Sequence, residues 1–186
     1  MGKRDKASKS ATSLVFPSIY LGPCSAASSI SFLTTNSITH VLSVGVKLKN
    51  PVDGVVYHYI ALEDKTSVWI FEACKEARKF INEALSSRNG TGKILVHCKA
   101  GISRSPTIVT EYLMRRHRMS LKAALGQIVR VRPQVVPNTG FLAQLRDLDM
   151  ELFGCVSLEV AVLPSREQDR LALFEVEEKA VALVAE

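Results

Sequence analysis

The stretch KILVHCKAGISRSPTIVTEYLMRRHR, residues 93–118, changes its pattern twice and decides the fold. Its opening residues, KILVHC, form a compact apolar run of the length of a buried strand. Its closing residues, from Pro106 onward, repeat apolar side chains at the spacing of one helix face, namely Ile108, Val109, Tyr112 and Leu113. The short segment CKAGISRS joins the two. The stretch therefore predicts a strand, a tight turn and a helix in direct succession.

Strand and helix patterns alternate on both sides of this unit. Runs rich in Val, Ile and Tyr predict strands within residues 13–22, 38–46 and 55–62. Helical spacing predicts helices within residues 25–38, 70–85, 120–131 and 139–150, and Pro133 and Pro137 separate the last two. This alternation favours an α/β fold in which a central, mainly parallel sheet of about five strands is flanked by helices on both faces.

The chain has the length and composition of one globular domain with short tails. Its 186 residues are 47% hydrophobic and 23% charged, and no apolar run approaches the length of a bilayer crossing. We expect a basic, flexible tail at residues 1–12, one folded domain at residues 13–154, and an acidic tail at residues 155–186 that is solvated or helical. Stable insertion into a membrane is not expected.

The net charge of +6 suits an enzyme that meets anionic substrates. Its Lys and Arg residues are scattered without interleaved aromatic residues, so nucleic-acid binding is not expected. The four cysteines are too dispersed to form metal-binding pairs, and no cofactor or metal is expected. The basic N-terminus lacks an apolar stretch behind it, which favours a reducing interior, cytoplasmic or also nuclear. The pattern does not indicate an oligomeric state.

The segment HCKAGISRS has the properties of an anion site. The backbone N–H groups of a tight loop and of a helix N-terminus lack internal partners, and they can donate to the oxygens of a phosphate. Gly101 lets the backbone curl, and Arg104 can hold two oxygens with its planar fork. The residues expected to surround the phosphate are therefore Lys99, Ala100, Gly101, Ile102, Ser103 and Arg104.

The same loop would activate Cys98 as a nucleophile. Oriented N–H dipoles and a nearby guanidinium favour the thiolate, so the pKa of Cys98 should lie below that of a free cysteine. Ser105 can donate a hydrogen bond to the sulfur and assist its departure when a covalent intermediate breaks down. His97 is expected to shape the loop from behind the sulfur, because a thiolate that is already ionised needs no general base.

These residues carry a resemblance. HCKAGISRSP resembles the HCxxGxxR[ST] signature of the protein tyrosine phosphatase superfamily, and AGISRS is similar to the dual-specificity phosphatases, here of the small atypical type. The similarity extends from about Phe16 to Phe153 and includes IYLG, VLSVG, YHYIALED and RPQVVPNTGFLAQL. The resemblance implies the α/β fold of the dual-specificity phosphatases. It also implies a metal-free, two-step hydrolysis of a phosphate ester through a cysteinyl-phosphate.

The resemblance also implies roles for two further residues. YHYIALED ends where the family carries its general acid, which makes Asp64 the candidate for protonating the leaving group. Glu63 and Asp53 are its rivals; strand alternation points Glu63 the opposite way, and Asp53 lies in the preceding turn. Asn138 matches a polar residue of the family that supports the loops around the active site.

The implied substrate is a phosphoprotein. Tyrosine-specific relatives have a longer domain, and fewer than a hundred residues precede Cys98, which implies a shallow pocket that admits phosphoserine and phosphothreonine as well as phosphotyrosine. Two alternatives stay open. Phosphoinositide phosphatases of the superfamily also have CKAG in the loop, where Lys99 could meet a ring phosphate, but they have a second lysine in place of Ile102. A pseudophosphatase that only binds phosphoproteins would typically lack Cys98.

Overall fold

A five-stranded sheet forms the centre of the protein in the computed structural model, which describes residues 11–175. Its strands are β1 (Ser13–Phe16), β2 (Ile19–Pro23), β3 (His40–Val44), β4 (Val56–Ile60) and β5 (Ile94–Cys98), arranged in the order β1-β2-β5-β3-β4. The pairs β2/β5, β5/β3 and β3/β4 are parallel, and only β1 pairs antiparallel with β2. The predicted α/β fold with a mainly parallel sheet of about five strands is confirmed.

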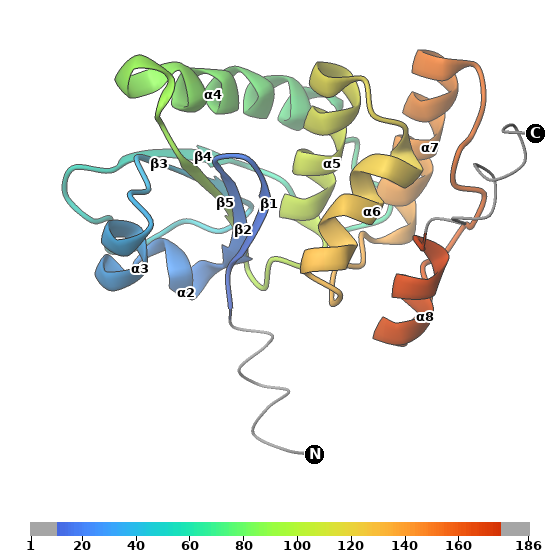
Figure 1. Ribbon diagram of the computed structural model, residues 1–186, viewed down its shortest axis with the longest axis horizontal. Helices are drawn as coiled ribbons and strands as arrows, with labels where there is room; N and C mark the ends of the chain where they lie inside the picture. Colours follow the sequence, from blue (N-terminus) through green and yellow to red (C-terminus); the bar gives the residue numbers. More distant parts are fainter. Residues whose placement is uncertain (1–10, 176–186) are drawn as a thin grey trace, which may run out of the picture.

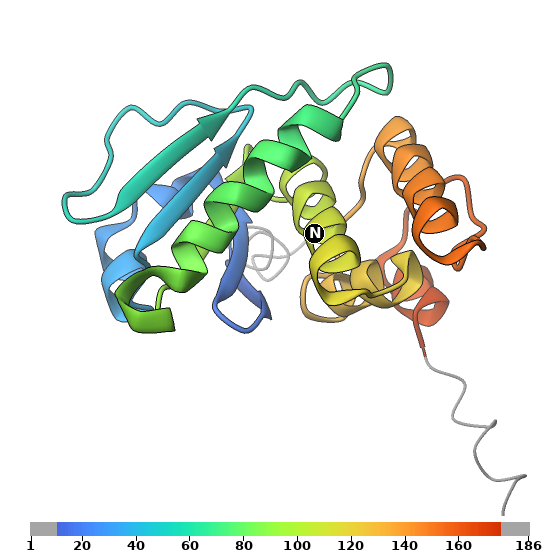
Figure 2. The ribbon, with the colours of Figure 1, turned by 90° about the horizontal axis from the view of Figure 1, so that it is seen from above.

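Helices cover both faces of this sheet (Figures 1 and 2). Short helices α2 (Cys24–Ala27) and α3 (Ile30–Thr35) lie on one face. The larger layer on the other face contains α4 (Phe71–Gly90), α5 (Arg104–His117), α6 (Leu121–Val131), α7 (Thr139–Phe153) and α8 (Glu167–Leu173). No helix within residues 11–175 is both long and apolar enough to cross a membrane.

Alternation along the central strands creates the two cores. Leu42 of β3 and Val96 of β5 face the large helical layer, whereas their neighbours Val41 and Leu95 face α2 and α3. All four side chains are fully buried. A strand buried on both faces reads as a continuous apolar run, which is why KILVHC shows no polar alternation.

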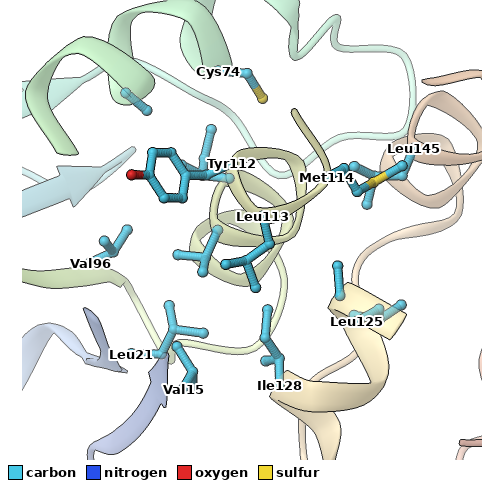
Figure 3. Close-up of a cluster of buried hydrophobic side chains, with 14 of the residues drawn as sticks. Val15, Leu21, Cys74, Val96, Tyr112, Leu113, Met114, Leu125, Ile128 and Leu145 are labelled. Carbon is cyan, nitrogen blue, oxygen red and sulfur yellow. The ribbon is translucent and has the colours of Figure 1, made fainter. Parts of the chain in front are cut away.

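Helix α5 lies at the centre of the larger core and directly follows the loop that joins it to β5. Ten consecutive residues from Ser105 to Met114 are buried, so nearly its whole circumference contacts protein. In Figure 3, Leu113 points toward Ile128 of α6, and Met114 lies beside Leu145 of α7. A helix enclosed in this way holds its N-terminus rigidly against the end of β5.

The structure corrects three details of the sequence reading. Residues 13–22 form a hairpin of two strands because Pro17 and Ser18 make a turn, with Ser18 at a φ of 64°. The expected single helix at residues 25–38 is two short helices, since α2 ends at the C-cap Ser28 and Ser29 caps the next helix by accepting from the Phe32 N–H. The helix that starts at Phe71 loses helical geometry at Ser87, two residues before the expected break.

Residues 155–175, the described part of the predicted acidic tail, pack on the domain and include the helix α8. Leu158, Leu163 and Phe174 are buried in the larger core. Phe174 contacts the flat surface at Gly126 of α6. The predicted tail at residues 1–12 and the rest of the acidic tail, residues 176–186, lie largely or wholly outside the described residues.

Candidate active site

The loop between β5 and α5 turns its carbonyl groups outward. The carbonyl oxygen of Lys99 accepts from the Cys24 N–H at 3.2 Å, and that of Ile102 accepts from the Val136 N–H at 2.9 Å. The carbonyl oxygens of Ala100 and Gly101 accept from the guanidinium of Arg132 at 3.0 and 2.8 Å. Because the surrounding protein engages these oxygens, the backbone N–H groups of the same loop are left to face the opposite side, where the sulfur lies.

Gly101 is required by the shape of this loop. Its φ is +67°, in the left-handed region, and a Cβ placed there would lie 2.5 Å from the carbonyl oxygen of Gly22. A side chain would therefore be strained both by its own backbone and by the neighbouring strand. The sequence reading had assigned this glycine to the curl of the loop, and the geometry gives the reason.

Cys98 ends β5 at the bottom of the loop and is 3% exposed. Burial opposes its ionisation, but hydrogen bonds from the Ser105 hydroxyl and from the N–H groups of Ser105, Ile102 and Gly101 outweigh burial, so the pKa of Cys98 is lowered. The Ser105 Oγ lies 3.3 Å from the sulfur. Hydrogen bonds thus hold the thiol toward its ionised form.

His97 lies behind the sulfur with its whole side chain buried. Its Nδ1 is 3.1 Å from the carbonyl oxygen of Cys98, which can only accept, so Nδ1 carries the proton. Its Nε2 is then the acceptor for the Ser43 hydroxyl at 2.7 Å. Burial lowers the pKa of His97, which keeps the ring neutral. This geometry joins β5 to β3 and shapes the backbone at the nucleophile.

Arg104 begins α5, and its mostly buried side chain reaches the segments that follow β3 and β4. Its Nη1 donates to the carbonyl oxygen of Gly45 at 3.0 Å, and its Nε lies 3.6 Å from Asp64 Oδ2, beyond hydrogen-bond distance. Within residues 11–175, that buried Nε has no hydrogen-bond partner. A Cβ at Gly45 would come within 2.4 Å of Arg104 Nη1, so this glycine leaves room for the guanidinium.

Asp64 is held beside the loop by two donors. Its Oδ1 accepts from the Ser103 hydroxyl at 2.7 Å and from Asn138 Nδ2 at 2.8 Å. Asn138 also donates its backbone N–H to Ser103 Oγ at 3.1 Å and caps α7 by accepting from the Phe141 N–H. Three segments far apart in the sequence, which carry Asp64, Ser103 and Asn138, therefore converge on one carboxylate.

Of the two rival carboxylates, Glu63 lies next to Asp64 on the same side of the molecule, whereas Asp53 lies elsewhere. Glu63 is exposed and pairs with Lys65 at 2.5 Å. Asp53 lies in a surface hollow with Val52, Gly54 and Arg88, on the side of the molecule near α3. The alternation argument against Glu63 does not apply directly, since β4 ends at Ile60. Contacts, rather than strand geometry, distinguish Asp64 from its neighbours.

Sequence reasoning missed the residues that support the loop. Arg132 is 1% exposed, and besides its two bonds to the loop it donates to the carbonyl oxygen of Ala11 at 2.5 Å. Gly140 meets the backbone of Thr66 so closely that a Cβ would lie 1.9 Å from its carbonyl oxygen. The signal available in the sequence was an arginine directly before Pro133, where a solvated charge is the ordinary expectation.

A cleft of about 720 Å³ opens beside Asp64 and Arg104. Its walls include Gly45, Tyr59, Val68, Trp69 and Glu72. A guanidinium with a free donor and a tethered carboxylate thus line an open cleft, beside the loop whose hydrogen bonds lower the pKa of the Cys98 thiol. This arrangement can bind a phosphate ester and attack its phosphorus.

Comparisons with known proteins agree with this geometry. A family described as dual specificity phosphatase, catalytic domain, matches residues 19–151. The chain is 40% identical over 142 residues to dual specificity protein phosphatase 1 of Arabidopsis thaliana, covering 75% of this chain and 70% of that protein. It is 36% identical over 137 residues to dual specificity protein phosphatase 1B of the same plant, covering 73% and 80%.

Solved structures show the same fold. A crystal structure of DUSP15 superimposes with a TM-score of 0.69 at 33% identity, covering 77% of this chain and 92% of that one. Human DUSP28 gives a TM-score of 0.69 at 28% identity, with 76% and 94% covered. The chain belongs to the dual specificity phosphatase family and is a hydrolase that removes phosphate from proteins.

Proposed function

We propose that Cys98 is the nucleophile of a two-step phosphoryl transfer. The observation that carries this proposal is the set of hydrogen bonds that lowers the pKa of Cys98 despite its burial. In the first step the thiolate attacks phosphorus, a sulfur–phosphorus bond forms and the phosphorus–oxygen bond to the protein substrate breaks. The N–H groups of Lys99, Ala100, Gly101, Ile102, Ser103 and Arg104, with the Arg104 side chain, hold the non-bridging oxygens.

Asp64 supplies the proton that the leaving oxygen needs. An alkoxide from a serine or threonine phosphate departs only when it is protonated, and a carboxyl beside Arg104 and the cleft is suitably placed to act as the acid. Ser103 and Asn138 position this carboxyl through Oδ1, which leaves Oδ2 for the substrate. In the second step the Asp64 carboxylate takes a proton from water, and the water oxygen attacks the cysteinyl-phosphate.

Ser105 assists the second step. The sulfur leaves as a thiolate when the water attacks, and the hydroxyl 3.3 Å away donates to the developing charge. His97 takes no proton in this scheme and positions Cys98 through the carbonyl contact. The scheme needs no metal, because the loop supplies the charge stabilisation. The partner is a phosphoprotein, and the free thiol of Cys98 suits a reducing compartment, cytoplasmic or also nuclear.

The test is the substitution Cys98→Ser. A serine keeps the shape of the loop but is not ionised by the same hydrogen bonds, so we expect turnover of an aryl phosphate to be lost while binding of inorganic phosphate persists. Isothermal titration with inorganic phosphate measures the binding, and release of the phenol measures turnover. Substantial turnover by this variant would contradict the scheme.

A further inference from the structure

A second, smaller pocket lies next to the active-site cleft and shares one wall with it. The pocket has a volume of about 190 Å³, the size of one large side chain. It lies between the start of α4, the middle of α5 and the face of α7, and its walls include Trp69, Phe71 and Leu148. Trp69 also lines the cleft that contains Asp64 and Arg104. The cleft and the pocket therefore meet at Trp69, and a peptide bound in the cleft can reach the pocket along this side chain.

The two aromatic residues of this pocket are unusually exposed. Trp69 is 79% exposed and Phe71 is 55% exposed, whereas Ile70 between them is buried. Below them Cys74 closes the pocket, and Figure 3 shows its sulfur reaching from α4 toward α5. Exposed aromatic residues around an apolar hollow are typical of a protein–protein contact, since they cover large apolar area with few rotatable bonds.

The polar residues of the pocket are mainly acidic. Glu111, Asp147 and Glu151 line it together with a single cation, Arg115, which is already paired with both glutamates. Among the described residues, Asp147 has no ion pair or side-chain hydrogen bond. This negative surface lies on a chain whose net charge is +6, so it does not simply follow the overall charge.

Glu111 adds a hydrogen-bond acceptor without a donor at the floor of the pocket. Its side chain is 5% exposed, and its Oε1 accepts from both Arg78 and Arg115. Its Oε2 is buried with no hydrogen-bond partner among residues 11–175. Burial raises the pKa of Glu111. A buried carboxylate oxygen without a donor is costly, and it adds an acceptor without a partner beneath Asp147 and Glu151.

We propose that this pocket docks a segment of the phosphoprotein substrate that has a large apolar side chain next to an arginine or lysine. The apolar side chain lies against Trp69, Phe71 and Leu148, and the basic group faces Asp147 and Glu151. The inference rests on the proposed function of the neighbouring cleft, and it adds a sequence preference outside the phosphorylated residue. Phosphopeptides with acidic residues at that place are disfavoured by the same charges.

The test compares two phosphopeptides that differ in one dipeptide, Leu-Arg or Ala-Glu, placed in turn at each position on either side of the phosphorylated residue. In at least one position, we expect kcat/KM to be about tenfold higher for the Leu-Arg peptide. The substitutions Phe71→Ala and Asp147→Lys should remove this advantage. The matched changes Val162→Ala and Asp169→Lys, which alter an exposed apolar and an exposed acidic residue elsewhere, should preserve it.

Each rate is divided by the rate on an aryl phosphate, which occupies only the catalytic loop and so separates docking from chemistry. Equal kcat/KM for the two peptides at every position would overturn the docking proposal. The proposal would also be overturned if the advantage of the Leu-Arg peptide survived both Phe71→Ala and Asp147→Lys. It would be overturned as well if sedimentation showed that Asp147→Lys changes only the oligomeric state. None of these results bears on Cys98; retained turnover by Cys98→Ser would instead overturn the mechanism.

A binding measurement uses the fact that Trp69 is the only tryptophan of the chain. In the full-length Cys98→Ser protein, an unphosphorylated Leu-Arg peptide should change the Trp69 fluorescence in a saturable way, and the Ala-Glu peptide should not. Inorganic phosphate gives the signal of the catalytic loop alone. The same response to both peptides would contradict the docking proposal.

Discussion

At the scale of single residues, the proposed mechanism depends on a sulfur whose ionisation is favoured by hydrogen bonds rather than by a neighbouring base. Three backbone N–H groups and the Ser105 hydroxyl offset the burial of Cys98. His97 is directly adjacent but uses both ring nitrogens for Ser43 and for the Cys98 carbonyl. The histidine therefore acts on the shape of the site, and the hydrogen bonds act on its charge.

Removing the Ser105 hydroxyl should weaken the thiolate. A hydrogen bond to a charged group contributes about 1.5–3 kcal/mol, so Ser105→Ala should move the pH midpoint of Cys98 alkylation by iodoacetamide upward. The same variant should accumulate more cysteinyl-phosphate, since the sulfur leaves less readily. Alkylation rates measured across pH check the first effect and rapid-quench experiments the second. An unchanged alkylation midpoint would contradict the role given to this hydroxyl.

Asp64 should matter most for substrates whose leaving group is a poor one. Losing a general acid typically costs about 10²–10⁴-fold in rate, so Asp64→Asn should lower kcat on a phosphoserine or phosphothreonine peptide by that order. Aryl phosphates with an acidic phenol should be less affected. The neighbouring change Glu63→Gln serves as the control, because Glu63 lines the same cleft but pairs with Lys65 and not with the residues that hold Asp64. An equal loss in both variants would show that Asp64 is not the acid.

At the scale of elements, the site depends on the segment between α6 and α7. Arg132 and Val136 hold the carbonyl groups of the catalytic loop, and Asn138 holds Asp64. The described part of the C-terminal extension supports this segment from outside, since buried Arg170 donates to the Pro133 carbonyl at 2.8 Å. The extension lies beyond residues 19–151, the part matched by the family.

The extension should therefore contribute to stability. Phe174 is 1% exposed, and truncating a buried phenylalanine costs about 3–5 kcal/mol, so Phe174→Ala should lower the free energy of unfolding by that amount. Val162→Ala, at a side chain that is 61% exposed, should change it by less than about 0.5 kcal/mol. Urea denaturation of both variants gives the comparison. A negligible loss for Phe174→Ala would mean that the extension is not part of the folded unit.

Features that depend on neighbouring residues in the sequence were predictable, whereas features that depend on contacts between distant residues were not. The unit from Ile94 to His117 was predictable because both its strand and its helix are buried and show their own period. The catalytic loop was predictable because its residue types are rare in combination. The bonds from Arg132 to the loop and from Arg170 to Pro133 were not, since each joins residues far apart through a backbone carbonyl that no side-chain pattern reveals.

At the scale of the whole molecule, folding brings together the ends of β5, β3 and β4 with the start of α5. In a parallel sheet, loops that follow the strands meet at one edge, and the site lies there. Cys98 ends β5, Gly45 follows β3, and Asp64 follows β4 at the same edge. The buried His97 lies in the middle of this arrangement, so global unfolding should respond to its protonation.

The free energy of unfolding should fall as the pH drops below 6.5. Burial lowers the pKa of His97, so below the ordinary value of 6.5 the unfolded chain takes up a proton that the folded chain refuses until lower pH. His40 and His117, whose pKa values are also lowered, add to the slope. Denaturation between pH 5 and 7 should show a shallower decline for His97→Asn than for the native chain. Parallel curves would contradict the buried, neutral state of His97.

The central claim is that a phosphoryl group passes through the sulfur of Cys98. Rapid acid quench of the enzyme during turnover of an aryl phosphate, followed by mass spectrometry of its peptides, tests this claim directly. We predict one phosphoryl group on the peptide that contains Cys98, more of it in Ser105→Ala, and none in Cys98→Ser. A phosphoryl group on any other residue, or steady turnover with no phosphorylated peptide even in Ser105→Ala, would contradict the account.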